Sequence, residues 1–257
     1  MRTSQYPVAA VSNEHPLVKL GRERFAGPKE AVIRFVEDEA ANAQLNDLDH
    51  YPHMFVLACC MDRQIMAERA WMIPHRVGRK LGGFDIERLA APSLDEYKAL
   101  FAAEKLHRYN DLMAEVLYLA VRRIVEQYGG DAARIWSDRP GSATVVCRFR
   151  EFDGVGPKIA TMAANILTRQ FKIPFADYRS IDVSPDVHVK RVMARTGLVP
   201  ENPDENAVIY AARELCPEFP GIIDFSLWEI GRQYCAPSDP NCAACPAREG
   251  CTTGRSA

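Results

Sequence analysis

Residues 152–160, FDGVGPKIA, are the stretch that is most informative about the fold. Gly154 and Gly156 can adopt backbone angles that other residues avoid, and Pro157 suits the first turn of a following helix. Helical patterns flank this stretch on both sides. It therefore predicts a tight turn between two helices. The exposed N–H groups of such a turn, added to a helix N-terminus, make a binding site for a phosphate.

The C-terminal tail holds four of the eight cysteines, in the stretch CAPSDPNCAACPAREGC at residues 235–251. Thiolates bind soft metals, and the C-x6-C-x2-C-x5-C spacing lets one loop wrap around a single centre. Structural zinc typically uses two compact C-x2-4-C pairs, and only one such pair is present. The spacing therefore favours a [4Fe–4S] cluster over a structural zinc. The candidate ligands are Cys235, Cys242, Cys245 and Cys251.

The rest of the chain has the composition of a helical globular protein. With 257 residues, 47% of them hydrophobic, it can bury one large core or two modest ones. No run shows convincing strand-like alternation, so the fold class is mostly α. The first 27 residues read as a loosely structured arm. Apolar spacing, with Pro74 ending the second segment, predicts helices at about 28–45, 53–73, 75–82, 93–105, 108–128, 142–151, 157–170, 185–196, 204–215 and 220–233.

Charge and hydropathy limit the classes of partner. The formal net charge of −2 argues against general binding to a polyanion. Residues 140–195, however, hold nine Lys or Arg against five acids, which suits nucleic acid as well as an ordinary solvated surface. No apolar run approaches the roughly 20 residues of a membrane span, and the N-terminus lacks a signal-peptide core. We expect a cytoplasmic protein without a membrane partner, associated with the nucleoid if it is bacterial.

The hairpin and the tail, approached by GRQYC at residues 231–235, resemble the helix-hairpin-helix base-excision DNA glycosylases of the endonuclease III type. The resemblance implies an all-α, two-domain fold with a [4Fe–4S] cofactor, acting as a monomer on double-stranded DNA that carries a damaged or modified base. It places a helical barrel domain at 53–170, ending in the hairpin, and an iron–sulfur domain at 171–257, with the segment 1–52 packed against the latter.

GVGPKIA is similar to the GVGxKTA hairpin of the bifunctional glycosylases, in which the lysine is the nucleophile, and Lys158 stands at that place. The resemblance implies that its amine attacks the sugar C1′, expels the base and leaves a Schiff base, which permits strand cleavage by β-elimination. A lysine that contacts a phosphate, or is merely solvated, is the alternative. The turn residues Gly154, Val155 and Gly156 are then expected to contact DNA.

Two aspartates in SIDVSPDVHVKRV, residues 180–192, compete for the carboxylate that a glycosylase needs near the sugar. Asp186 matches the D-x-H-[hydrophobic]-x-R-V pattern of the family. With Ser184 as the N-cap, Asp186 also falls in the first turn of a helix, where the helix N-terminus stabilises its negative charge. A role in helix capping without catalysis is the alternative for Asp186. It follows Lys158 by 28 residues (158 to 186), more than is usual in the family, so Asp182 stays an alternative. We expect a cleft between the domains to place Lys158 opposite Asp186.

The stretch LACCMDRQIMAERA, residues 57–70, occupies the region where the family has a glutamine that fills the gap left by an extruded base. Met61 aligns with that glutamine and Gln64 lies nearby, so either is a candidate wedge. Cys59 and Cys60 are candidates for the base pocket or for core packing.

The resemblance covers about residues 53–251 and implies a bifunctional DNA glycosylase with abasic-site lyase activity. One alternative is an iron–sulfur protein that binds DNA without glycosylase chemistry. Another is a zinc-stabilised helical interaction module.

Overall fold

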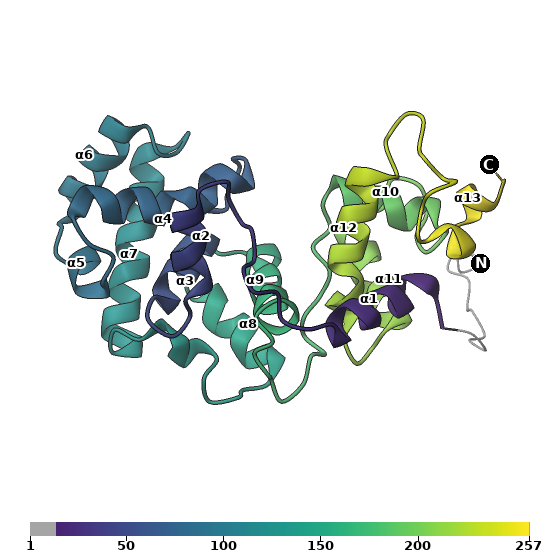
Figure 1. Cartoon of the computed structure of the whole chain (residues 1–257), viewed down its shortest axis with the longest axis horizontal. Coiled ribbons are helices and arrows are strands. Elements are labelled where there is room, and N and C mark those ends of the chain that lie inside the picture. The colour runs from purple at the N-terminus through teal and green to yellow at the C-terminus, as the bar shows by residue number, and fades with distance from the viewer. Residues whose placement is uncertain (1–13, 257) are drawn as a thin grey trace, which may run out of the picture. The chain divides into compact units, whose positions relative to one another are not determined.

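The computed structural model describes residues 14–256, which are helical and contain no β-strand (Figure 1). The predicted all-α fold class is confirmed. The α-helices are α1 Pro16–Ala26, α2 Glu39–Asn46, α3 Pro52–Met61, α4 Ala67–Leu81, α5 Ile86–Ala90, α6 Leu94–Glu104, α7 Asn110–Tyr128, α8 Ser142–Arg150, α9 Pro157–Arg169, α10 Val187–Arg195, α11 Glu205–Leu215, α12 Asp224–Gln233 and α13 Thr252–Ser256. Short 3-10 helices are η1 Ala132–Ile135, η2 Pro220–Ile223 and η3 Arg248–Gly250.

The chain forms two compact units. Unit 2 contains Glu30–Pro140 and Thr144–Ala163, and unit 1 contains the described residues up to Lys29 together with the C-terminal part from Ala164 onward and the short piece Gly141–Ala143. Residues 30–52 therefore group with the barrel helices and not, as the sequence suggested, with the cysteine-rich part. The reason is that α2 packs against α3 and α4.

The N-terminal arm differs from its prediction. Residues 16–26, expected to be loosely structured, form α1, which begins with Pro16 and is capped by His15, whose Nδ1 accepts from the Leu17 N–H at 3.2 Å. Leu17 and Val18 are buried. The first 13 residues of the predicted arm lie outside the described part.

The single helix predicted over 28–45 is replaced by an irregular segment with several bends and the shorter α2. The amide of Asn42 holds this segment: its Oδ1 accepts from the N–H groups of Phe35 at 2.9 Å and Val36 at 3.1 Å, and its Nδ2 donates to the Val36 carbonyl at 2.6 Å. Asn46 pairs with the backbone of Ile33 in the same way. Two side-chain amides thus supply the hydrogen bonds that a helix would otherwise make.

The prediction that Pro74 ends a helix is wrong. Helix α3 already ends at Met61, and a separate helix, α4, begins at Ala67 and runs through Pro74 to Leu81. A proline inside a helix removes one backbone donor. Trp71, Ile73 and Val77 are buried around it, and their burial offsets that loss.

Helices α10 and α12 pack closely at Gly231. A Cβ atom on Gly231 would lie 2.6 Å from the Cβ of His188 and 3.2 Å from its carbonyl oxygen. We expect Gly231→Ala to lower the free energy of unfolding by about 1–3 kcal/mol, because the two helices must move apart. Denaturant unfolding measures this loss. Gly156→Ala is the control, since a Cβ there meets nothing within 4 Å; an equal loss in both variants would contradict the packing argument.

Candidate active site and cysteine loop

The glycine turn predicted from the sequence is present between α8 and α9. Gly154 has φ +77°, in the left-handed region that favours glycine. The Val155 N–H donates to the Phe152 carbonyl at 3.1 Å. The Val155 side chain is buried in the protein, which anchors the turn. Gly154 is exposed and Gly156 is half-buried. The turn therefore offers its backbone, and not the Val155 side chain, to solvent.

Lys158 is the second residue of α9, and its side chain is exposed. The charge of Lys158 acts on one carboxylate that the sequence motifs do not include, that of Asp62. Asp62 follows α3 directly; burial raises the pKa of its carboxyl, whereas a hydrogen bond from Trp71 Nε1 at 3.3 Å and the charge of Lys158 act in the opposite direction. The one sequence signal for Asp62 is an acid that comes straight after a helix that is apolar apart from His53.

The two candidate wedge residues differ in exposure. Met61 is the last residue of α3, all of whose residues are buried, and its own exposed fraction is 0%. Gln64 is exposed, with φ +55°. Residues of the α6–α7 loop hold it: Tyr109 Oη donates to Gln64 Oε1 at 3.2 Å, and Arg108 Nη1 donates to its carbonyl at 3.4 Å. Of the two, only Gln64 exposes its side chain to solvent.

Cys59 and Cys60 lie in the core of unit 2 and are fully buried. Burial raises the pKa of Cys59 well above its usual value and that of Cys60 to about 12. Both thiols therefore stay protonated near neutral pH. Their position fits core packing, the alternative to a base-pocket role.

The two aspartates before α10 have different partners. Asp186 is itself the N-cap, because its Oδ1 accepts from the N–H groups of His188 and Val189, both at 2.8 Å. The sequence placed the cap two residues earlier, at Ser184. Asp182 instead forms a two-oxygen ion pair with Arg213, at 2.7 and 2.8 Å. An ion pair of this kind engages both oxygens of Asp182, whereas the capping bonds of Asp186 use only one.

Lys158 belongs to unit 2 and Asp186 to unit 1.

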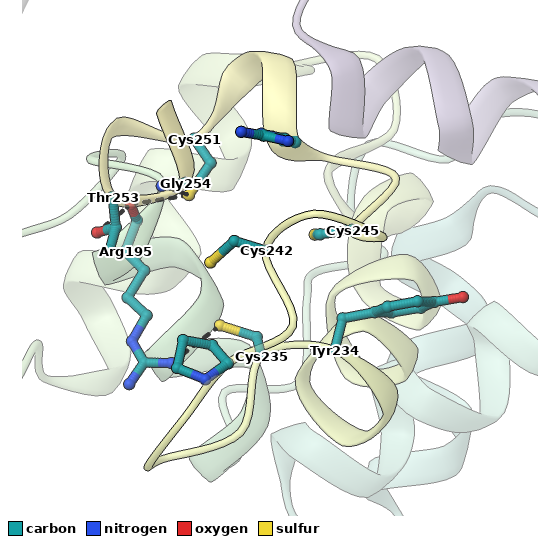
Figure 2. A pocket seen from close by; sticks show the side chains of 10 residues that line it. Arg195, Tyr234, Cys235, Cys242, Cys245, Cys251, Thr253 and Gly254 are labelled. Atoms are coloured by element: carbon teal, nitrogen blue, oxygen red, sulfur yellow. Dashed lines mark hydrogen bonds between the residues drawn. The ribbon is translucent and has the colours of Figure 1, made fainter. Parts of the chain in front are cut away.

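The four tail cysteines line one pocket in unit 1 (Figure 2). Two of the sulfurs receive hydrogen bonds: Arg195 Nη1 donates to Cys235 Sγ at 3.4 Å, and the Gly254 N–H donates to Cys251 Sγ at 3.2 Å. Burial raises the pKa of Cys245, and the three other thiols add to this effect. The four sulfurs are therefore close enough to influence one another.

Four thiolates are a donor set that a [4Fe–4S] cluster takes, with each thiolate at a different iron. Within residues 14–256, no three His, Cys, Asp or Glu side chains are grouped so that they could hold one metal ion. N–H donors to the sulfurs are also typical of the surroundings of iron–sulfur clusters.

Comparisons with solved structures agree on the architecture. A trapped endonuclease III–DNA covalent intermediate matches 93% of this chain and 94% of its own, with a TM-score of 0.58 at 17% identity. A thermostable thymine-DNA glycosylase matches 80% and 85%, with a TM-score of 0.56 at 18% identity. The chain has the helix-hairpin-helix DNA glycosylase fold.

A third structure with this glycosylase fold is an 8-oxoguanine glycosylase/lyase from Clostridium acetobutylicum, bound to double-stranded DNA with cytosine opposite 8-oxoguanine. It matches 85% of this chain and 66% of its own, with a TM-score of 0.55 at 16% identity. No family model and no curated protein matches the sequence. None of the helices in the described part of this glycosylase fold is long and apolar enough to cross a membrane.

Within the glycosylase fold, α10 connects the candidate carboxylate to the cysteine loop. Asp186 caps its start, and two arginines further along hold the loop. Arg191 Nε donates to the Cys235 carbonyl at 2.7 Å, and Arg195 Nη1 donates to the Ala236 carbonyl at 2.6 Å. The contact of Arg195 with Cys235 is visible in Figure 2. Arg191 is the arginine of the D-x-H-[hydrophobic]-x-R-V pattern, and its i, i+4 spacing with Arg195 places both on one helix face.

Proposed function

We propose that the protein is a bifunctional DNA glycosylase, which excises a damaged or modified base from double-stranded DNA and cleaves the strand at the abasic site. The observation that carries this proposal is Lys158, an exposed amine in the first turn of α9, directly after the glycine turn. A lysine in the hairpin of this fold supplies the one group that lyase chemistry requires, an amine able to form a Schiff base.

In the proposed reaction, the Lys158 amine forms a bond to C1′ as the glycosidic bond breaks, and the bonding electrons leave with the base. The C1′–O4′ bond of the sugar ring then opens, with a proton moving from the amine to O4′, which leaves a Schiff base between Lys158 and C1′. The Schiff base acidifies the C2′ hydrogens, so that β-elimination expels the 3′ phosphate and cleaves the strand. The Asp186 carboxylate stabilises the positive charge that develops on the sugar and assists proton transfer.

Two other features would bind the DNA. The exposed backbone of Gly154 and Gly156, with the N-terminus of α9, suits a phosphate. Gln64, held by Arg108 and Tyr109, would fill the gap left in the duplex when the base is extruded.

We also propose that Cys235, Cys242, Cys245 and Cys251 hold a [4Fe–4S] cluster, because they surround one cavity and two of them receive N–H hydrogen bonds. The cluster supplies structural cross-linking of the C-terminal loop. Arg191 and Arg195 tie that loop to the helix whose first turn Asp186 caps.

A cleavage assay with a panel of duplexes tests the function. The panel contains oxidised pyrimidines, 8-oxoguanine opposite each base, uracil, a G·T mismatch, alkylated purines and a plain abasic site, each with and without borohydride. We expect excision of at least one base and a covalent adduct on borohydride treatment. Tight binding without excision of any base would favour the alternative of a DNA-binding protein that lacks glycosylase chemistry.

The two aspartates give a matched pair of variants. We expect Asp186→Asn to lower the rate of base excision by at least about 100-fold, because the carboxylate is lost. The free energy of unfolding should change by less than about 0.5 kcal/mol, because asparagine caps a helix as well as aspartate does. Asp182→Asn should instead weaken the ion pair with Arg213 and lower the free energy of unfolding by about 1 kcal/mol. Its rate of base excision should stay at the wild-type level. Single-turnover excision and denaturant unfolding measure both. Loss of excision in Asp182→Asn alone would reassign the carboxylate.

A further inference from the structure

Two loops of unit 2 meet at the imidazole ring of His107, a residue that has no part in the function proposed above. One loop, residues 62–66, follows α3 and contains Gln64. The other, residues 105–109, connects α6 to α7. We propose that His107 is a positioning residue: it ties the two loops together and so holds Gln64 ready to enter the DNA duplex. This role rests on the proposed function, in which Gln64 fills the gap left by an extruded base.

Both ring nitrogens of His107 have a partner in the backbone. Nδ1 accepts from the Tyr109 N–H at 3.1 Å, within the same loop. Nε2 lies 3.0 Å from the Arg63 carbonyl oxygen, in the other loop. An N–H group can only donate and a carbonyl can only accept, so the ring makes both bonds when it is neutral with its proton on Nε2. His107 is only 2% exposed, and burial lowers the pKa of the ring, which favours this neutral form.

The contacts continue from Tyr109 back to the first loop. Tyr109 Oη donates to Gln64 Oε1 at 3.2 Å, and Gln64 directly follows Arg63 in the chain. The contacts therefore form a closed ring that runs from His107 through Tyr109, Gln64 and Arg63 back to His107. Each member of this ring is held from two sides. The ring fixes the side chain of Gln64 as well as the backbone that precedes it.

The backbone of Gln64 is in a conformation that needs such support. Its φ is +55°, in the left-handed region that residues other than glycine rarely adopt. A backbone in this region persists where its surroundings hold it there. The Arg63 carbonyl that His107 binds belongs to the peptide group directly before Gln64. The bond to His107 therefore fixes the peptide plane whose orientation sets the φ of Gln64.

The α6–α7 loop is a firm attachment for this ring of contacts. Arg69 of α4 donates to two carbonyls of the loop, from Nη2 to Lys105 at 2.5 Å and from Nε to Leu106 at 3.2 Å. The His107 N–H donates to Asn110 Oδ1 at 2.9 Å, where α7 begins. The imidazole of His107 therefore extends from a loop that is itself held to the loop that follows α3.

The surface around the two loops suits DNA. Met66, Tyr109 and Leu112 are exposed large apolar side chains in or beside the loops. Arg108 is exposed as well, and its guanidinium lies 4.8 Å from the centre of the Tyr109 ring. Aromatic rings stack on unpaired bases, and cations bind phosphates. His107 is buried, so it acts on this surface through the residues that it positions.

Two substitutions of His107 separate its two bonds. In His107→Asn the side-chain oxygen can replace Nδ1 and accept from the Tyr109 N–H, but the side chain is too short to reach Arg63. In His107→Gln the amide nitrogen reaches as far as Nε2 and can donate to the Arg63 carbonyl, whereas the bond to Tyr109 is lost. Each variant loses one buried hydrogen bond, so the two should lose similar stability. The proposal depends on the bond between the loops, which only glutamine keeps.

The probe is a duplex that contains an uncleavable abasic analogue opposite 2-aminopurine, whose fluorescence changes when its stacking is broken. We expect wild type to change the fluorescence as Gln64 enters the gap. His107→Asn should require about tenfold more protein for half of this change, as the loss of one buried hydrogen bond implies. His107→Gln should stay within about threefold of wild type. Denaturant unfolding of both variants checks that their stabilities match.

A double substitution tests whether His107 acts through Gln64. If it does, His107→Asn should have little further effect in a protein that already carries Gln64→Ala, because the side chain to be positioned is missing. A histidine that only stabilises unit 2 would weaken binding by the same factor in both backgrounds. The half-maximal protein concentrations of the four proteins give this comparison.

His50→Asn serves as the control, because His50 is an exposed histidine outside the two loops; it should match wild type within about twofold. If wild type neither excises any base nor changes the fluorescence, the proposed function fails. If wild type and His107→Asn insert equally, or if the effects of His107→Asn and Gln64→Ala add, the role of His107 fails and the function stands.

Should His107→Asn unfold, Tyr109→Phe decides. This variant opens the ring of contacts at the Tyr109 hydroxyl and leaves His107 in place. It should require at least about threefold more protein for half of the fluorescence change. Insertion at the wild-type level in Tyr109→Phe would overturn the proposal.

Discussion

Replacement of Lys158 by alanine should abolish the covalent adduct between the protein and abasic-site DNA, a loss of at least about 1,000-fold in trapping rate. The side chain is exposed at the start of α9, so alanine removes the amine without opening a cavity. The free energy of unfolding should therefore change little. The loss of trapping would then reflect the missing amine and not a less stable protein. The measurement is borohydride trapping, with the adduct resolved from free protein on a denaturing gel.

Lys98→Ala is a suitable control, because Lys98 is a partly exposed lysine of α6 in the same unit. It should trap DNA at the wild-type rate. An adduct of undiminished intensity in Lys158→Ala would show that another amine forms the Schiff base, and the assignment of the nucleophile would have to be abandoned. Binding to an uncleavable abasic analogue, measured in parallel, separates a loss of chemistry from a loss of affinity.

Substitution of Cys245 by serine should remove the cluster. We expect the purified wild-type protein to be brown, with broad absorbance near about 400 nm from thiolate-to-iron charge transfer. Loss of one of four thiolates should eliminate most of this absorbance and of the bound iron and sulfide, and lower the melting temperature, because the C-terminal loop loses its cross-link. Absorbance, iron analysis and thermal unfolding measure these changes.

Cys147→Ser is the matched control, since Cys147 is exposed on α8 and lies outside the cavity. Its colour and iron content should equal those of wild type. A colourless wild-type protein with one bound zinc would contradict the cluster and favour the zinc-stabilised module instead.

The sequence predicts best where spacing alone determines geometry. Glycines in FDGVG can form a left-handed turn irrespective of their surroundings, and Gly154 does so. The close spacing of the tail cysteines likewise restricts them to one loop, and they line one cavity. The start of α10 was off by two residues, because Ser184 and Asp186 are both good caps and tertiary contacts choose between them. Ser184 donates its N–H to Asp224 of α12, a partner that local sequence cannot reveal.

The sequence predicts poorly where burial decides a role. Helix α3 is apolar on every side, so its pattern has no face that distinguishes the core from a DNA-contacting surface. Met61 and Gln64 therefore looked equivalent, although one is buried and the other exposed. Asp62 was missed for a related reason: an acid after an apolar run usually marks a solvated helix end, and its enclosure depends on Trp71, which comes from the next helix.

The irregular segment around Phe35 connects two of these observations. The amide of Asn42 holds the N–H groups of Phe35 and Val36, and the Phe35 ring covers Trp71, which in turn orients Asp62. In a deuterium-exchange experiment these two amides should exchange slowly although they lie outside any helix. Their exchange rates would then report how often the cover over Trp71 opens, and so how rigidly the protein holds the Asp62 carboxylate that Trp71 orients.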